Sequence, residues 1–170
     1  QILARLEKQA QFSFANITHT TSEEISKTVL SGVRRNLAVD QIATQLQDKF
    51  STLLGEGRAQ TIARTETLTA VSLGQAAQMD AAKEVIPGLV KVWVDSGDDL
   101  VRGNPGGLYS EAKHKHWDVN GGKAIPVDDP FSNGLMFPRE PGGEPGNVIN
   151  CRCDMLTLDP REAETLGVDL

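Results

Sequence analysis

The stretch RAQTIARTETLTAVSLGQAAQMDAAK, residues 58–83, decides the architecture of this chain. Small side chains recur along it at helical spacing, namely Ala59, Ala63, Ala70, Gly74, Ala77 and Ala81. Residues spaced in this way share one face of a helix, and small ones let a neighbouring backbone approach closely. We therefore predict a long, central helix over 58–83. Its close partner is another part of the same domain or, alternatively, a helix of another subunit.

The residues before this stretch also carry the periodicity of helices. We predict one helix over about 1–16, a second from Thr21 to about Asn36, and a third over about 39–54. Thr21 and Glu24 have the spacing of a capping box, which satisfies free backbone N–H groups at a helix start. Residues 55–57, Gly-Glu-Gly, separate the third helix from the long one.

The residues after Pro87 have a different character. All eight prolines lie at or after Pro87, and so do twelve of the sixteen glycines. Proline and glycine interrupt regular structure, so this part is expected to be rich in loops and short strands. Alternating apolar residues predict a strand over 89–94, and shorter signals predict strands over 124–127, 135–137 and 148–158. A short helix is predicted over 108–117.

Together these elements predict an α+β fold, in which an N-terminal helical bundle packs against a small, irregular, mostly antiparallel sheet. We divide the chain into a helical lead at 1–57, a core domain at 58–158 and a C-terminal tail at 159–170. The chain begins with Gln1 and not with Met, so we expect it to be part of a longer protein.

The charge distribution limits the partners of this chain. Residues 1–85 hold nine basic and nine acidic residues, whereas residues 86–170 hold eight basic and fourteen acidic ones, which accounts for the whole net charge of -6. Domains that bind the phosphate backbone of DNA are usually basic. Because this chain carries a net negative charge, we expect no strong DNA binding. No stretch has the length and apolar character of a membrane span, so we expect no membrane partner.

Cys151 and Cys153 are the chain's two cysteines, and His114 and His116 are nearby candidates for partners. Thiolates and imidazoles are zinc ligands. One alternative is a zinc site of all four residues, and another uses His116 with one or both of Cys151 and Cys153. A third is a nucleophilic thiol activated by a histidine. Our preferred interpretation is structural: both thiols are buried core side chains in a final strand, with no metal and no cofactor.

Charged residues within the long helix need partners. Arg64 and Glu66 interrupt a helix of small and apolar residues, and they are too close in sequence to face each other. In the final strand, Arg152 and Asp154 lie on the face opposite to the thiols, beside Asn150. We predict that this seam contacts Arg64 or Glu66. The loop pairs Asp98-Asp99 and Asp128-Asp129 are alternative cation ligands.

The order of several short motifs resembles the phage Mu F-like head morphogenesis family, also called minor capsid or minor head proteins. The resemblance runs over about 25–156, and its final element, Asn150-Cys151-Arg152-Cys153, is the most specific. The preceding elements are Ile62-Ala63-Arg64-Thr65-Glu66, Lys91-Val92-Trp93, Asp99-Leu100-Val101-Arg102, His116 near Asp118 and Gly121, Asp129-Pro130-Phe131 and Phe137-Pro138. His116 follows Arg102 at a longer distance than in the family pattern, because residues 103–115 intervene.

The resemblance implies a structural protein of phage or prophage heads, present in few copies near the portal and the packaged DNA. It implies portal, capsid or scaffold proteins as partners, and a location in the virion and, during assembly, in the host cytoplasm. It supplies no catalytic residue. The residues that we assign to its structural motif are Arg64, Thr65, Glu66, Arg102, His116, Asn150, Cys151, Arg152 and Cys153. The alternative function is a toxin-like or metal-dependent enzyme that uses Glu66, His116 and Cys151.

Overall fold

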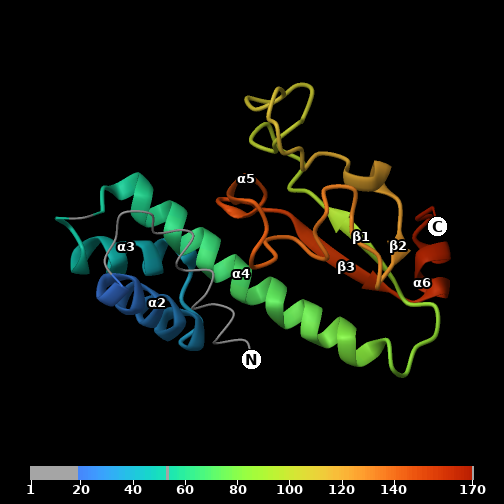
Figure 1. Cartoon of the computed structure of the whole chain (residues 1–170), viewed down its shortest axis with the longest axis horizontal. Helices are drawn as coiled ribbons and strands as arrows, with labels where there is room; N and C mark the ends of the chain where they lie inside the picture. The colour runs from blue at the N-terminus through green and yellow to red at the C-terminus, as the bar shows by residue number, and fades with distance from the viewer. Residues whose placement is uncertain (1–18, 53, 170) are drawn as a thin grey trace.

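The computed structural model describes residues 19–52 and 54–169. The helix predicted over 1–16 lies outside the described residues. Within them the order of elements is three helices, a first strand, a long irregular region with a short strand, a final strand and a terminal helix (Figure 1). The predicted α+β class is confirmed.

The helical bundle consists of α2 (His19–Arg34), α3 (Val39–Lys49) and the first half of α4 (Glu56–Ala82). Its core is made of the apolar faces of these helices and of the turn after α3: Ile25, Val29, Ile42, Ala43, Leu46, Phe50, Leu54, Ala59, Ile62 and Ala63. The predicted end of the second helix is confirmed, because Asn36 has the left-handed φ of 54°. The predicted start at Thr21 is wrong, because His19 and Thr20, the first described residues, already adopt helical backbone.

Helix α4 is shared between two cores. Its first half completes the bundle, and its second half covers one face of the sheet with Leu73, Ala76 and Met79 (Figure 1). The predicted long helix is thus confirmed, with bounds two residues earlier at the start and one at the end. α4 therefore connects the bundle to the sheet, because it contributes side chains to both cores.

The predicted close packing of the small residues on α4 is confirmed only in part. Ala59 and Ala63 are buried, but Ala77 and Ala81 are exposed, and a Cβ at Gly74 would have open space around it. Ala59 and Ala81 differ by only about 40° around the helix, so the stripe keeps nearly one direction. The buried face changes instead, because α4 passes from the core of the bundle to that of the sheet. The close approach occurs at Gly32 of α2 instead, where a Cβ would lie 2.6 Å from Ile42 Cγ1.

The sheet is small and antiparallel. Its order is β2 (Ile125–Pro126), β1 (Val90–Val94), β3 (Asp154–Leu158), and Trp93 of β1 lies opposite Met155 of β3. One face packs on α4. The other packs on the short helix α6 (Pro160–Thr165), whose Ala163 is fully buried. The division at residues 57 and 158 stays a prediction.

Lys91 is an unusual member of the central strand. It is fully buried, and its ammonium donates to the Met136 carbonyl at 2.9 Å and lies 5.0 Å from the centre of the Phe131 ring. Burial lowers the pKa of Lys91, although nearby carboxylates, Glu140 first among them, oppose this effect. The ammonium thereby ties the irregular segment around Met136 to the sheet.

Two predicted elements in the second half are wrong, and the predicted final strand is too long at its start. Residues 108–117 form turns and not a helix, because their backbone bonds run to distant residues, such as Gly103 N–H to the Tyr109 carbonyl. Residues 135–137 form no strand, since Pro138 and the left-handed Arg139 follow them. The final strand begins at Asp154. The helical turn α5 (Pro145–Val148) and the left-handed Asn150 precede it.

Candidate functional site

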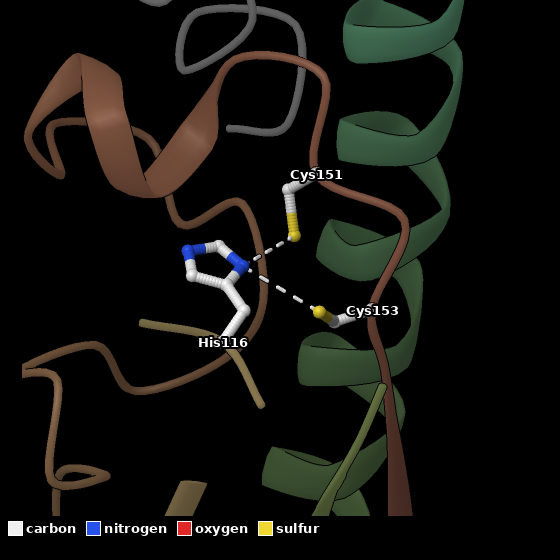
Figure 2. A group of neighbouring side chains, drawn as sticks. All are labelled: His116, Cys151 and Cys153. Atoms are coloured by element: carbon white, nitrogen blue, oxygen red, sulfur yellow. Dashed lines mark hydrogen bonds between the residues drawn. The ribbon is translucent and has the colours of Figure 1, made fainter. Parts of the chain in front are cut away.

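Three buried side chains converge at the end of the irregular region. Figure 2 shows that the two sulfurs point at the same nitrogen of the histidine ring. His116 Nδ1 lies 3.3 Å from Cys151 Sγ and 3.5 Å from Cys153 Sγ. The three residues are between 2% and 4% exposed, and their ligand atoms all lie within 4.8 Å of one another. The structure therefore brings together the three residues that the sequence offered as a zinc alternative.

The histidine is positioned by the loop that carries it. His116 N–H donates to the Arg102 carbonyl at 2.7 Å, and the Arg102 guanidinium donates to the Ile149 carbonyl at 3.0 Å. The ring of Trp93 meets the His116 ring edge to face, with centroids 5.5 Å apart. Arg102 thus ties the loop of His116 to the segment that precedes the cysteines.

The cysteines are positioned by Arg139, which is 1% exposed. Its guanidinium donates to the carbonyls of Cys151 and Cys153, and to Ser72 Oγ of α4 at 2.6 Å. The segment 151–153 is therefore fixed through its carbonyls, while alternation of its side chains turns both thiols towards His116. The predicted burial of both thiols on one side is confirmed.

The surroundings shift the pKa values of the two thiols in opposite directions. The hydrogen bond from Cys153 lowers the pKa of Cys151 to about 4, with help from His116 and Arg139, and against burial. The same hydrogen bond and burial raise the pKa of Cys153. The hydrogen bond between the two thiols thus favours a thiolate at Cys151 over one at Cys153.

A pocket of about 230 Å³ adjoins this cluster. Its lining residues are Ser96, Leu100, Val101, Arg102, Tyr109, His116, Asn150, Cys151, Arg152 and Cys153. Arg152 forms an ion pair with Asp98 at 2.5 Å, and this contact lowers the pKa of Asp98. The cluster thus borders a pocket, while both cysteines also belong to the apolar core that α4 and the sheet share.

Helix α4 contacts the same segment from its other side. Arg64 donates to Asn150 Oδ1 at 2.8 Å, and Asn150 N–H donates to Thr65 Oγ1 at 2.9 Å. The predicted contact between Arg64 and this segment is present, through Asn150. Arg152 forms its ion pair with Asp98 of the loop after β1.

The comparison with protein families agrees with this arrangement. The model of the family described as Phage Mu protein F like protein matches residues 23–156. This chain belongs to the phage Mu F-like family. The match begins in α2 and ends inside β3, so it contains the bundle, the pocket and all nine residues of the predicted structural motif. No curated protein and no solved structure matches the chain.

Membership in the phage Mu F-like family indicates a role in phage head morphogenesis, with other head proteins as partners and the virion as location. Among the described residues, no helix combines the length and apolar character needed to cross a membrane.

Two alternatives from the sequence can be compared with the positions of their residues. His114 lies outside the cluster and meets Glu144 at 3.2 Å, so the four-ligand zinc site is not formed. Glu66 is buried but is not among the residues that line the pocket.

Two residues that support the cluster could not be found by sequence reasoning. Arg139 and Ser72 have no recognisable spacing with the cysteines, whereas Trp93 belongs to the Lys91-Val92-Trp93 motif. Of the two, Arg139 alone carries a signal. It is an arginine between Pro138 and Glu140 in a segment without regular structure, where a buried cation needs several acceptors.

Proposed function

We propose that this chain is a minor, structural component of a phage or prophage head, located near the portal and the packaged DNA. The observation that carries the proposal is the family match over residues 23–156, which spans both cores. We assign it portal, capsid or scaffold proteins as partners, and the host cytoplasm as its place during assembly.

The architecture supports a structural role over catalysis. A toxin-like enzyme would need Glu66, His116 and Cys151 around one substrate, but Glu66 does not line the pocket. The Cys151 thiol is 2% exposed, which restricts attack on a large substrate. The polar groups around it are instead engaged in tying segments together, as Arg139 and Arg102 do.

The proposal is tested by deleting the gene from the phage or prophage that encodes it. We expect infectious particles to fall to background while major capsid protein and portal are still made, and a copy in trans to restore the yield. Electron microscopy of the lysate should show aberrant or DNA-deficient heads. A deletion mutant with normal yield and DNA-filled heads would overturn the proposal.

Complementation also separates the structural role from the enzymatic alternative. A Glu66→Gln copy keeps the size of the side chain and a hydrogen-bonding end but removes its carboxylate. If the role is structural, this copy should restore particle yield whenever its protein accumulates to the normal level. The enzymatic alternative would be favoured if the wild-type copy restored the particle yield and the Glu66→Gln copy did not, although both proteins accumulated equally and both gave normal heads.

A further inference from the structure

We propose that His116, Cys151 and Cys153 bind one zinc ion, with a fourth coordination position open towards the adjoining pocket. This goes beyond the role in head assembly and does not depend on it. It also replaces the metal-free interpretation that the sequence favoured, because the geometry of the three side chains meets the requirements of a metal site.

The distances fit zinc. Zinc lies about 2.3 Å from thiolate sulfur and about 2.0–2.1 Å from imidazole nitrogen, and tetrahedral angles then separate sulfur from nitrogen by about 3.6 Å. His116 Nδ1 lies 3.3 Å from one sulfur and 3.5 Å from the other. Both nitrogen–sulfur distances therefore lie within a few tenths of an ångström of those in a zinc site, and all three ligand atoms lie within 4.8 Å of one another.

Hydrogen bonds account for the contacts only pairwise. Cys153 hydrogen-bonds to Cys151, and His116 Nδ1 makes one good bond to one sulfur, since a ring nitrogen has either one N–H or one lone pair. Both sulfurs nevertheless point at it (Figure 2). A metal ion uses all three donor atoms at once, which accounts for their shared direction.

The ligand types select the metal. Two thiolates and an imidazole suit zinc, whereas magnesium and calcium prefer oxygen ligands. Three protein ligands of the Cys2His type with an open fourth position are a known arrangement for zinc. Here the same three residues line a pocket of about 230 Å³, so a water molecule can reach the fourth position in the isolated chain.

The surroundings favour a thiolate at Cys151, because Arg139 Nη1 lies 4.0 Å from Cys151 Sγ. The buried Trp93 indole N–H offsets only part of the effects that raise the pKa of Cys153, so zinc must displace the Cys153 proton on binding. Arg102 approaches His116 Nε2 at 3.5 Å. When Nδ1 binds the metal, Nε2 carries the proton, so Arg102 is left with its bond to the Ile149 carbonyl.

The site would fasten an irregular loop. Residues 95–118, all of them described, contain no helix or strand between β1 and the 3-10 helix η1 (Val119–Gly122). His116 lies at the end of this loop, and the cysteines lie directly before β3. A zinc ion would thus join the loop to the sheet, next to the bonds that Arg102 already makes.

The test uses the whole 170-residue chain, purified without chelators. We expect elemental analysis to find one zinc ion per chain. Replacement by cobalt should give the intense visible bands of tetrahedral coordination, with thiolate charge-transfer absorption equivalent to two sulfurs. Less than half-stoichiometric zinc after incubation with zinc salt and desalting, or the weak spectrum of octahedral cobalt, would overturn the proposal.

Variants identify the ligands. His116→Ala and Cys153→Ser should each weaken zinc binding by more than about 100-fold, which exceeds the usual loss on removing a supporting outer residue. His114→Ala is the matched control, since His114 pairs with Glu144 outside the cluster, and it should keep full zinc content. Equal zinc binding by the His114 and His116 variants would overturn the proposal. If the ligand variants fail to fold, the cobalt spectrum of the wild-type chain decides alone.

Discussion

Arg64 of helix α4 donates a hydrogen bond to Asn150 at 2.8 Å, across 86 residues of sequence. One residue further along the helix, Thr65 accepts the backbone N–H of Asn150 at 2.9 Å. These contacts attach the segment before β3 to the helix that connects both cores. The segment that carries Cys151 and Cys153 is therefore attached to α4, the helix shared by both cores.

The Thr65 contact is expected to contribute measurably to stability. Thr65 is 1% exposed, and Thr65→Val would keep its shape but leave the Asn150 N–H without this acceptor. Removing one partner of such a bond costs about 1–3 kcal/mol. Thr61→Val is the control, because its hydroxyl bonds only to the carbonyl of Gly57 in an exposed turn. Urea unfolding should show the larger loss for Thr65→Val, and equal losses would contradict the role of this contact.

The close approach of α2 and α3 is expected at Gly32. Alanine favours a helix over glycine by about 1 kcal/mol, so Gly74→Ala, which meets open space, should stabilise the chain. Gly32→Ala has the same propensity gain, but its Cβ would meet the buried Ile42 side chain. Overpacking of a core costs about 1–3 kcal/mol. The Gly32 variant should melt at a lower temperature than the Gly74 variant, and the reverse order would show that the helices separate easily.

Part of this architecture could be predicted because it depends on local patterns. The long helix, the central strand and the shared direction of Cys151 and Cys153 follow from periods of 3.6 and 2. The irregular region could not be predicted, since its backbone bonds are long-range, as between Arg102 and His116. Arg139 illustrates the limit. Its side chain bonds carbonyls 12 and 14 residues later, and no spacing in the sequence encodes that contact.

Arg139 is expected to be the costliest single polar residue to replace near the site. Arg139→Met would remove the donor to the carbonyls of Cys151 and Cys153 and to Ser72. Hydrogen bonds to a charged group contribute about 1.5–3 kcal/mol each, so a loss of about 3 kcal/mol or more follows. Arg58→Met, at an exposed position of α4, should stay within about 0.5 kcal/mol of wild type. Indistinguishable urea midpoints for the two variants would refute this role.

Weak interaction with DNA is a further expectation. The net charge of -6 resides in the second half of the chain, which repels a phosphate backbone. Electrophoretic shifts with duplex DNA at ~150 mM salt should show no binding below ~10 µM, since non-specific affinities of DNA-binding proteins run about 10⁻⁴–10⁻⁶ M. A tight complex that resists added salt would mean that a local basic surface outweighs the net charge.

The most direct measurement of the central claim is quantitative mass spectrometry of purified heads from the phage or prophage that encodes this chain. If the chain is a minor head component near the portal, its peptides should be present at far lower abundance than those of the major capsid protein. Chemical cross-links should join it to the portal in the same particles. Heads that contain DNA and are infectious, yet carry no peptide of this chain, would contradict the claim.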